Sequence, residues 1–271
     1  MQPIHRLWRK KDFFRFLDKR QRFALQTVIL TAGLLVTQLI WTDFRFLMVV
    51  ILSLASYVLS VWSLKEDIRR IEWIFLFILP VFFTASVSLF YFLLPARWII
   101  RLFTIIIFSV GNYAILLVEN IYNVAIERSI QLLRAAHSVG LLITLVIVFF
   151  SSIIIYSLRM PFWLNLIFMV PVIFPLVLQS LWSMKLEEKI SPEILQYSGI
   201  ITLGIGELAV ALSFWPIANT AYALLMTASF YCITGIVQQH LLEKLFKDTV
   251  KEYLTVFIFT LVLTFLITKW G

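Results

Sequence analysis

Long, unbroken apolar runs follow one another along almost the whole chain after residue 22, and they constrain the fold more than any other feature. Hydrophobic residues make up 61% of the 271 residues, and only 14% are charged. A soluble globular domain is usually about half apolar and roughly a quarter charged, so a chain of this composition needs a lipid bilayer around it. A β-barrel would show short segments of alternating polarity instead. We therefore expect an all-α, polytopic bundle of transmembrane helices.

About nine of the runs can cross a membrane, and most reach the roughly 20 residues that a hydrocarbon core of about 30 Å requires. The expected spans are about 23–42, 44–64, 73–94, 98–118, 138–158, 162–184, 195–215, 217–239 and 253–269. Eight of the nine tryptophans lie near the ends of these spans, as expected for an aromatic belt at the level of the lipid head groups. The sequence thus predicts one helical membrane domain over residues 23–271.

The distribution of lysine and arginine predicts the orientation of the spans. If the N-terminus is cytoplasmic, 18 of the 23 basic residues fall in cytoplasmic segments and five on the other side. This bias follows the positive-inside rule, and nine spans then place the C-terminus outside. We expect a multi-pass protein of a bacterial-type inner membrane. Orientation also accounts for the net charge of +8, so nucleic-acid binding is not expected.

Residues 1–22 form a basic arm that carries eight of the lysines and arginines, interleaved with apolar residues. The simplest interpretation is a topogenic signal that holds the N-terminus in the cytoplasm. A site for anionic lipid, or a helix that binds a partner, would have a similar composition.

Glu207 is the one carboxylate inside an otherwise apolar span, at 195–215. An ionisable group at such a depth is costly and is a functional-site hypothesis by default. Because Gly199, Gly204 and Gly206 would let another helix approach closely, we expect the carboxylate to be buried against protein. Three roles remain open: a structural hydrogen bond, a proton- or cation-coupling site, and a substrate contact.

Arg101 is the basic residue nearest in depth to Glu207, one turn into the span 98–118. The predicted axial gap between the two is roughly 7 Å, which two long side chains can bridge. The sequence therefore suggests an ion pair between Arg101 and Glu207.

A second polar feature lies between the fourth and fifth spans. At 100° per residue, its polar residues fall within an arc of about 120° on a helix; they are Glu119, Asn120, Asn123, Glu127, Gln131, Arg134 and His137. If the fourth helix continues into this stretch, Asn112 extends the same stripe into the bilayer. The stripe is either the solvated face of an interfacial helix or the lining of a polar cavity that opens to the cytoplasm.

The same stretch, ENIYNVAIERSIQLLRAAH at residues 119–137, resembles a family of uncharacterised multi-pass bacterial membrane proteins. The resemblance implies the membrane class. It implies no chemistry, because that family has no assigned activity.

Local signals also mark helix ends and bends. Ser191, Pro192 and Glu193 form the pattern of an N-cap, a first-turn proline and an acidic first turn for the seventh span. Pro171 and Pro175 lie inside the sixth span, where proline removes backbone N–H groups and favours a kink.

Motifs of soluble and metal-dependent enzymes are missing from the sequence, and the single cysteine and three distant histidines predict neither a metal site nor a cofactor. Our leading interpretation is a transporter-like or small-ligand-handling protein of unknown substrate. In it Glu207 is the intramembrane ionisable site, and the 119–137 face is a cytoplasmic vestibule. One alternative is a membrane-embedded enzyme that acts on a lipid head group through Glu127, Arg134 and His137. A non-catalytic membrane scaffold is the other.

Overall fold

The computed structural model describes residues 18–39, 44–64, 75–95, 97–125, 131–187 and 190–268. Within these ranges the chain is all-α and has nine helices. They are α1 (Lys19–Leu39), α2 (Arg45–Leu64), α4 (Ile78–Tyr91), α5 (Trp98–Ala125), α6 (Leu133–Ser157), α7 (Phe162–Lys185), α8 (Pro192–Ser213), α9 (Asn219–Leu241) and α10 (Lys247–Ile267).

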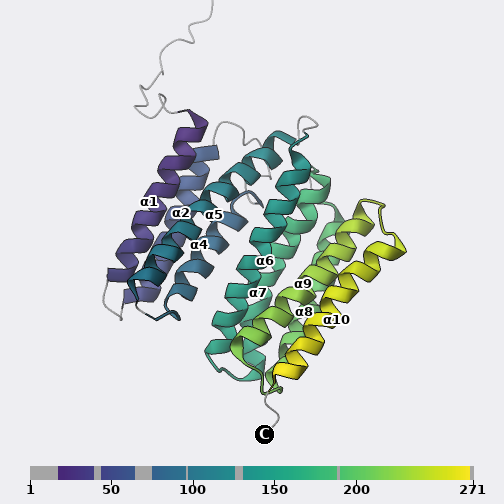
Figure 1. The fold of residues 1–271 in the computed structure, drawn as a ribbon. Coiled ribbons are helices and arrows are strands. Elements are labelled where there is room, and N and C mark those ends of the chain that lie inside the picture. The colour runs from purple at the N-terminus through teal and green to yellow at the C-terminus, as the bar shows by residue number, and fades with distance from the viewer. Residues whose placement is uncertain are drawn as a thin grey trace, which may run out of the picture.

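Seven of these helices are long and apolar enough to cross a membrane, namely α2 and α5 to α10. Helix α4 is apolar but has only 14 residues, and α1 is not among the seven. The helices lie side by side and alternate in direction, and α1 begins at the end of the bundle opposite to that at which α10 ends (Figure 1). The expected multi-pass helical bundle is confirmed at this level.

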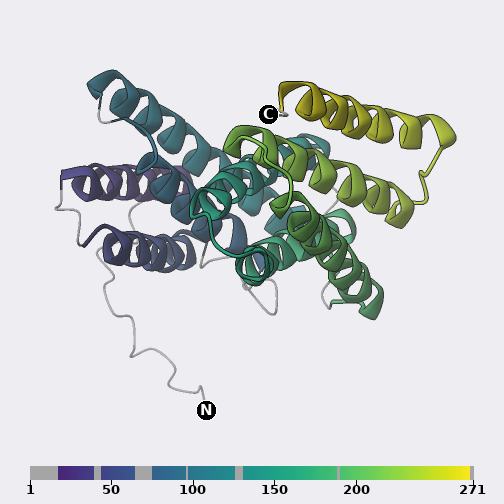
Figure 2. The same ribbon diagram turned by 90° about the horizontal axis from the view of Figure 1, so that it is seen from below.

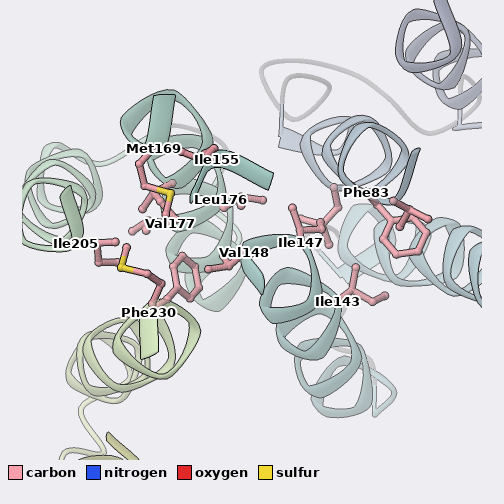
Figure 3. Close-up of a cluster of buried hydrophobic side chains, with 14 of the residues drawn as sticks. Phe83, Ile143, Ile147, Val148, Ile155, Met169, Leu176, Val177, Ile205 and Phe230 are labelled. Carbon is pink, nitrogen blue, oxygen red and sulfur yellow. The ribbon is translucent and has the colours of Figure 1, made fainter. Parts of the chain in front are cut away.

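Helix α6 is the centre of the bundle, since it packs against α4, α5, α7 and α9. Helices α1 and α2 lie on one side of this centre, and α8 and α10 lie on the other (Figure 2). The main apolar core is built from α6 and α7 with their neighbours; Ile147, Val148, Val177, Ile205 and Phe230 are representative members (Figure 3).

Many serines and threonines inside the helices donate to carbonyls of their own helix, which satisfies them without water. Thr144 Oγ1 donates to Gly140 O at 2.8 Å, and Thr202 Oγ1 donates to Ser198 O at 2.6 Å. At the start of α8, Ser191 Oγ accepts from the N–H of Ile194 at 3.4 Å, so the predicted N-cap is confirmed.

Helices α5 and α6 extend beyond the predicted spans 98–118 and 138–158. Helix α5 continues to Ala125, and α6 begins at Leu133. The amphipathic stretch 119–137 therefore consists largely of the facing ends of two spanning helices. Residues 1–17 of the basic arm lie outside the described residues.

Candidate functional site

The polar stripe of α5 faces the interior of the bundle. Asn112 and Glu119 are fully buried, and Asn123 is 4% exposed. Their spacing of seven and four residues places them on one face of a helix, and this face packs against the rest of the bundle. The alternative of a solvated face is wrong for these three residues, because they are enclosed by protein.

Glu119 makes one hydrogen bond, to a residue of α7. Gln179 Nε2 donates to Glu119 Oε1 at 2.6 Å. The other carboxyl oxygen, Oε2, is buried without a hydrogen-bond partner, and among the described residues no cationic side chain pairs with Glu119. A buried carboxylate that lacks a counter-charge is very unfavourable. In this arrangement, Glu119 is stable as the neutral acid or with a cation bound beside it.

Tyr122 of α5 and His137 of α6 make contacts that join α5, α6 and α7. The Tyr122 hydroxyl donates to Ala136 O at 3.1 Å, and His137 Nε2 lies 2.8 Å from Ser183 O. The two rings also contact each other, with centroids 5.6 Å apart. Since a carbonyl oxygen only accepts hydrogen bonds, Nε2 of His137 carries a proton in this contact.

A small cavity lies beside these residues and has a volume of about 10 Å³. That is close to the space one water molecule needs. Its polar lining comes from four helices, α5, α6, α7 and α9: Tyr122, His137, Thr144, Gln179, Ser180, Ser183 and Gln238. Gln179 thus borders the cavity with the same side chain that bonds to Glu119.

One glutamine side chain from α7 and one from α9 line the cavity. Gln238 Nε2 donates to Ser180 O at 3.0 Å and to Ser180 Oγ at 2.8 Å. Gln179 Oε1 is buried and has no hydrogen-bond partner. Gln179, Ser180 and Gln238 were not among the residues predicted from the sequence. The signal for them is an amide inside each of two apolar runs, at a depth similar to that of Glu119.

Glu207 does not belong to this site. Its side chain is exposed on the outer side of α8. The expectation that it is buried against protein is therefore wrong. The reason is the rotational setting of α8, which directs Ile201, Ile205 and Ala209 into the core and leaves residue 207 outside.

The expected pair of Arg101 and Glu207 is not formed. Helix α5 packs on α1, α4 and α6, whereas α8 packs on α7 and α9. No ion pair joins the two side chains, which both lie in the described part of the chain. Similar depth in the membrane did not imply proximity, because the two helices lie on different flanks of the bundle.

Two of the three residues of the alternative enzyme site are described, and one of these two lines the cavity. Arg134 is exposed and does not line it. His137 is half-buried and does line it. Glu127 lies outside the described residues. Among the residues described, no group of three or more His, Cys, Asp or Glu side chains is placed to hold a metal ion.

A second polar cluster lies at the opposite end of the bundle. Asn165 Nδ2 donates to Ser213 Oγ at 2.9 Å, and Tyr156 stacks on Tyr222 with ring centroids 4.0 Å apart. Apolar core residues such as Ile147 of α6 and Ile173 of α7 lie along these helices between the residues of the two clusters, and Figure 3 shows Ile147 in this core. Apolar residues of α6 and α7 thus lie between the two polar clusters.

Neither a curated protein nor a solved structure matches this chain. One protein family does match, over residues 25–267: DUF5656, whose members are described as proteins of unknown function. This agrees with the resemblance of the 119–137 stretch to uncharacterised multi-pass membrane proteins. The chain belongs to the DUF5656 family.

Proposed function

We propose that this protein is a transporter-like, ligand-handling membrane protein whose intramembrane ionisable group is Glu119. One observation carries the proposal: a fully buried carboxyl group is held by Gln179, whose side chain also borders a polar cavity. Glu119 therefore takes the role that the sequence suggested for Glu207.

The cost of burying Glu119 argues for a functional reason. An apolar residue at this position would pack without a desolvation penalty, and replacing buried polar groups with apolar ones is often neutral or stabilising. Ionisable residues inside membrane proteins are rare and mark ion or substrate pathways. Glu119 is buried although no cationic side chain among the described residues pairs with it, which supports a role in binding.

The surroundings of Glu119 suit a proton or a small monovalent cation. A carboxyl oxygen of Glu119 and the amide oxygen of Gln179 are both buried acceptors without a hydrogen-bond donor. Oxygen acceptors of this kind bind hard cations, and a neutral carboxyl group can release a proton in exchange. The half-buried His137, on the cavity wall, offers a group that can pass protons between water and the site.

The apolar layer supports a gated path. In this conformation apolar core residues of α6 and α7, such as Ile147 and Ile173, lie between the residues of the two polar clusters. Helix α7 contributes Asn165 to one cluster and Gln179 to the other, and Pro171 lies between them. Because proline removes a backbone hydrogen bond, α7 is the element best suited to bend when a ligand passes.

For the topology we propose the arrangement that the sequence predicts. We infer nine crossings with the N-terminus in the cytoplasm, in a bacterial-type inner membrane. The bias of lysine and arginine and the alternating helices of Figure 1 support this arrangement. The Glu119 cavity would then lie at the cytoplasmic end, and the basic arm, residues 1–22, would contact anionic lipid there.

The proposal is tested by ion flux across vesicles. The purified chain is reconstituted in liposomes that contain a pH-sensitive dye, and a proton gradient is imposed in the presence of Na⁺ or K⁺. We expect the wild type to dissipate the gradient faster than protein-free liposomes, Glu119→Gln to lose at least 90% of that rate, and Glu207→Gln to retain it. Equal rates for wild type and Glu119→Gln would contradict the proposal.

A further inference from the structure

We propose that the outer face of α8 is a dimer interface, at which two copies of this chain pair around a two-fold axis with their Glu207 side chains in contact. This outer face consists of Ile200, Leu203, Gly204, Glu207, Ala211 and Phe214, all exposed in the single chain. At 100° per residue these six positions fall within an arc of about 100°, and Glu207 lies near its centre.

The Glu207 carboxyl group lacks a hydrogen-bond partner in the described part of the single chain. It lies within the candidate span Pro192–Ser213, and Leu203 and Phe214 around it are 61% and 71% exposed. No hydrogen bond or ion pair joins Glu207 to another residue of the described chain. A carboxyl group facing hydrocarbon without a hydrogen bond is strongly unfavourable. The single chain leaves this group unsatisfied.

A second copy of the chain, related by two-fold symmetry, can supply a hydrogen-bond partner for the Glu207 carboxyl group. Two copies inserted in the same direction are related by an axis along the membrane normal, so each residue meets its counterpart at the same depth. A neutral carboxyl group has both a donor and an acceptor, and two of them can form reciprocal hydrogen bonds. Any other partner would need its own polar group at the depth of Glu207.

Gly204 gives a second, independent argument. A side-chain carbon added at Gly204 would meet no atom within 4 Å, whereas one added at Gly206 would lie 2.6 Å from Leu166 of α7. Packing within the single chain therefore requires a glycine at position 206 but not at position 204. Glycine inside a helix is destabilising relative to alanine. A glycine one turn from Glu207 is explained if two α8 helices approach closely there.

The end of the outer face also offers room for a second copy. An open hollow of about 450 Å³ is lined by Ala211, Phe214, Trp215, Pro216 and Phe265. Two of these residues, Ala211 and Phe214, belong to the outer face. In a two-fold dimer the hollow of each copy lies beside the Phe214 ring of the other, which can fill part of it.

The oligomeric state in a bilayer tests the proposal. The full chain carries one fluorophore on a terminal tag and is reconstituted in vesicles at low protein density, where bleaching steps are counted. We expect two bleaching steps for the wild type and for Glu207→Gln, because two amide side chains can also pair. For Glu207→Leu we expect the dimer dissociation constant to rise at least tenfold. Gly204→Leu should be monomeric through steric exclusion, although its monomer has space for the side chain. Val110→Leu, on the exposed side of α5, should behave as the wild type.

Cross-linking supplies a matched measurement. In a Cys232→Ala background, Gly204→Cys should form a disulfide between copies upon mild oxidation, and Val110→Cys should not. Each variant is checked for an unchanged thermal unfolding midpoint. A monomeric wild type, or a dimer that survives Glu207→Leu and Gly204→Leu, would overturn the proposal. Both outcomes are independent of ion flux through the Glu119 site.

Discussion

Gln179 donates a 2.6 Å hydrogen bond to Glu119, and this bond joins α7 to α5 inside the bundle. The two side chains are 1% and 0% exposed, so water does not compete for the bond. It is the contact that positions the only carboxyl group buried among the described residues. The chemistry proposed for this protein therefore depends on the hydrogen bond between Glu119 and Gln179, which are 60 residues apart in the sequence.

Gln179→Leu should destabilise the protein by about 1–2 kcal/mol, because the buried Glu119 carboxyl group loses its donor. The double variant Glu119→Leu/Gln179→Leu should recover most of that loss, since both partners are then apolar. Reversible unfolding in mixed micelles measures both. Gln239→Leu, at a partly exposed position of α9, serves as the control. A double variant less stable than Gln179→Leu would contradict this account of the pair.

Gly140→Ala should disturb the cavity through Tyr122. The added carbon would lie 2.6 Å from the Tyr122 hydroxyl oxygen, which donates to Ala136 O. We expect a loss of about 1–3 kcal/mol from overpacking. In a Tyr122→Phe background the loss should be smaller, because the oxygen that clashes is absent. The unfolding free energies of the wild type and the three variants in this cycle test the prediction, and equal losses in both backgrounds would contradict it.

Gly235→Ala should loosen the docking of α10 on α9. A side-chain carbon at Gly235 would collide with the ring of Tyr253, and α10 makes its extensive contacts with α9. Since α10 buries little beyond Thr260 and Thr264, it has few other contacts to hold it. Hydrogen exchange of α10 should rise several-fold while that of α6 stays unchanged. Unchanged exchange in α10 would mean that the glycine is not needed for this contact.

The sequence predicted the helical membrane class, because composition and run length alone determine it. The predicted spans 98–118 and 138–158 are shorter than α5 and α6, and the sequence left open whether the fourth helix continues past residue 118. Mean hydropathy averages over all sides of a helix. The polar residues near Glu119 therefore lowered the mean hydropathy of this stretch, although they face inward. Polar residues that face protein and those that face water give the same average, and only packing distinguishes them.

The sequence also selected the wrong carboxylate as the buried one. Glu207 stands in a run that is apolar on every side, so the pattern did not reveal which side of α8 faces lipid. Glu119 stands in a stripe with Asn112 and Asn123, and all three are buried, although none of them lines the cavity. Gln179 and Gln238 were missed because isolated amides in apolar runs do not show which other helix they will meet.

Arg101→Gln and Glu207→Gln should have additive effects on the stability of the monomer. The side chains lie on helices that do not pack extensively on each other, and such sites are expected to add within about 0.5 kcal/mol. A double-mutant cycle in detergent, under conditions that keep the protein monomeric, measures the coupling. A coupling energy clearly above that value would show that the two side chains interact directly after all.

The most direct test of the central claim is infrared spectroscopy of the carboxyl groups during a pH titration in lipid. If Glu119 is the buried ionisable group, the wild type shows the C=O band of a carboxylic acid in an apolar environment, and the band responds reversibly to bulk pH. The measurement is made in a Glu207→Gln background, which removes the carboxyl group proposed to pair between copies; the band should be present in this variant and missing when Glu119→Gln is added. A band that persists in Glu119→Gln/Glu207→Gln, or a band in folded Glu207→Gln that does not respond to bulk pH, would contradict the role assigned to Glu119.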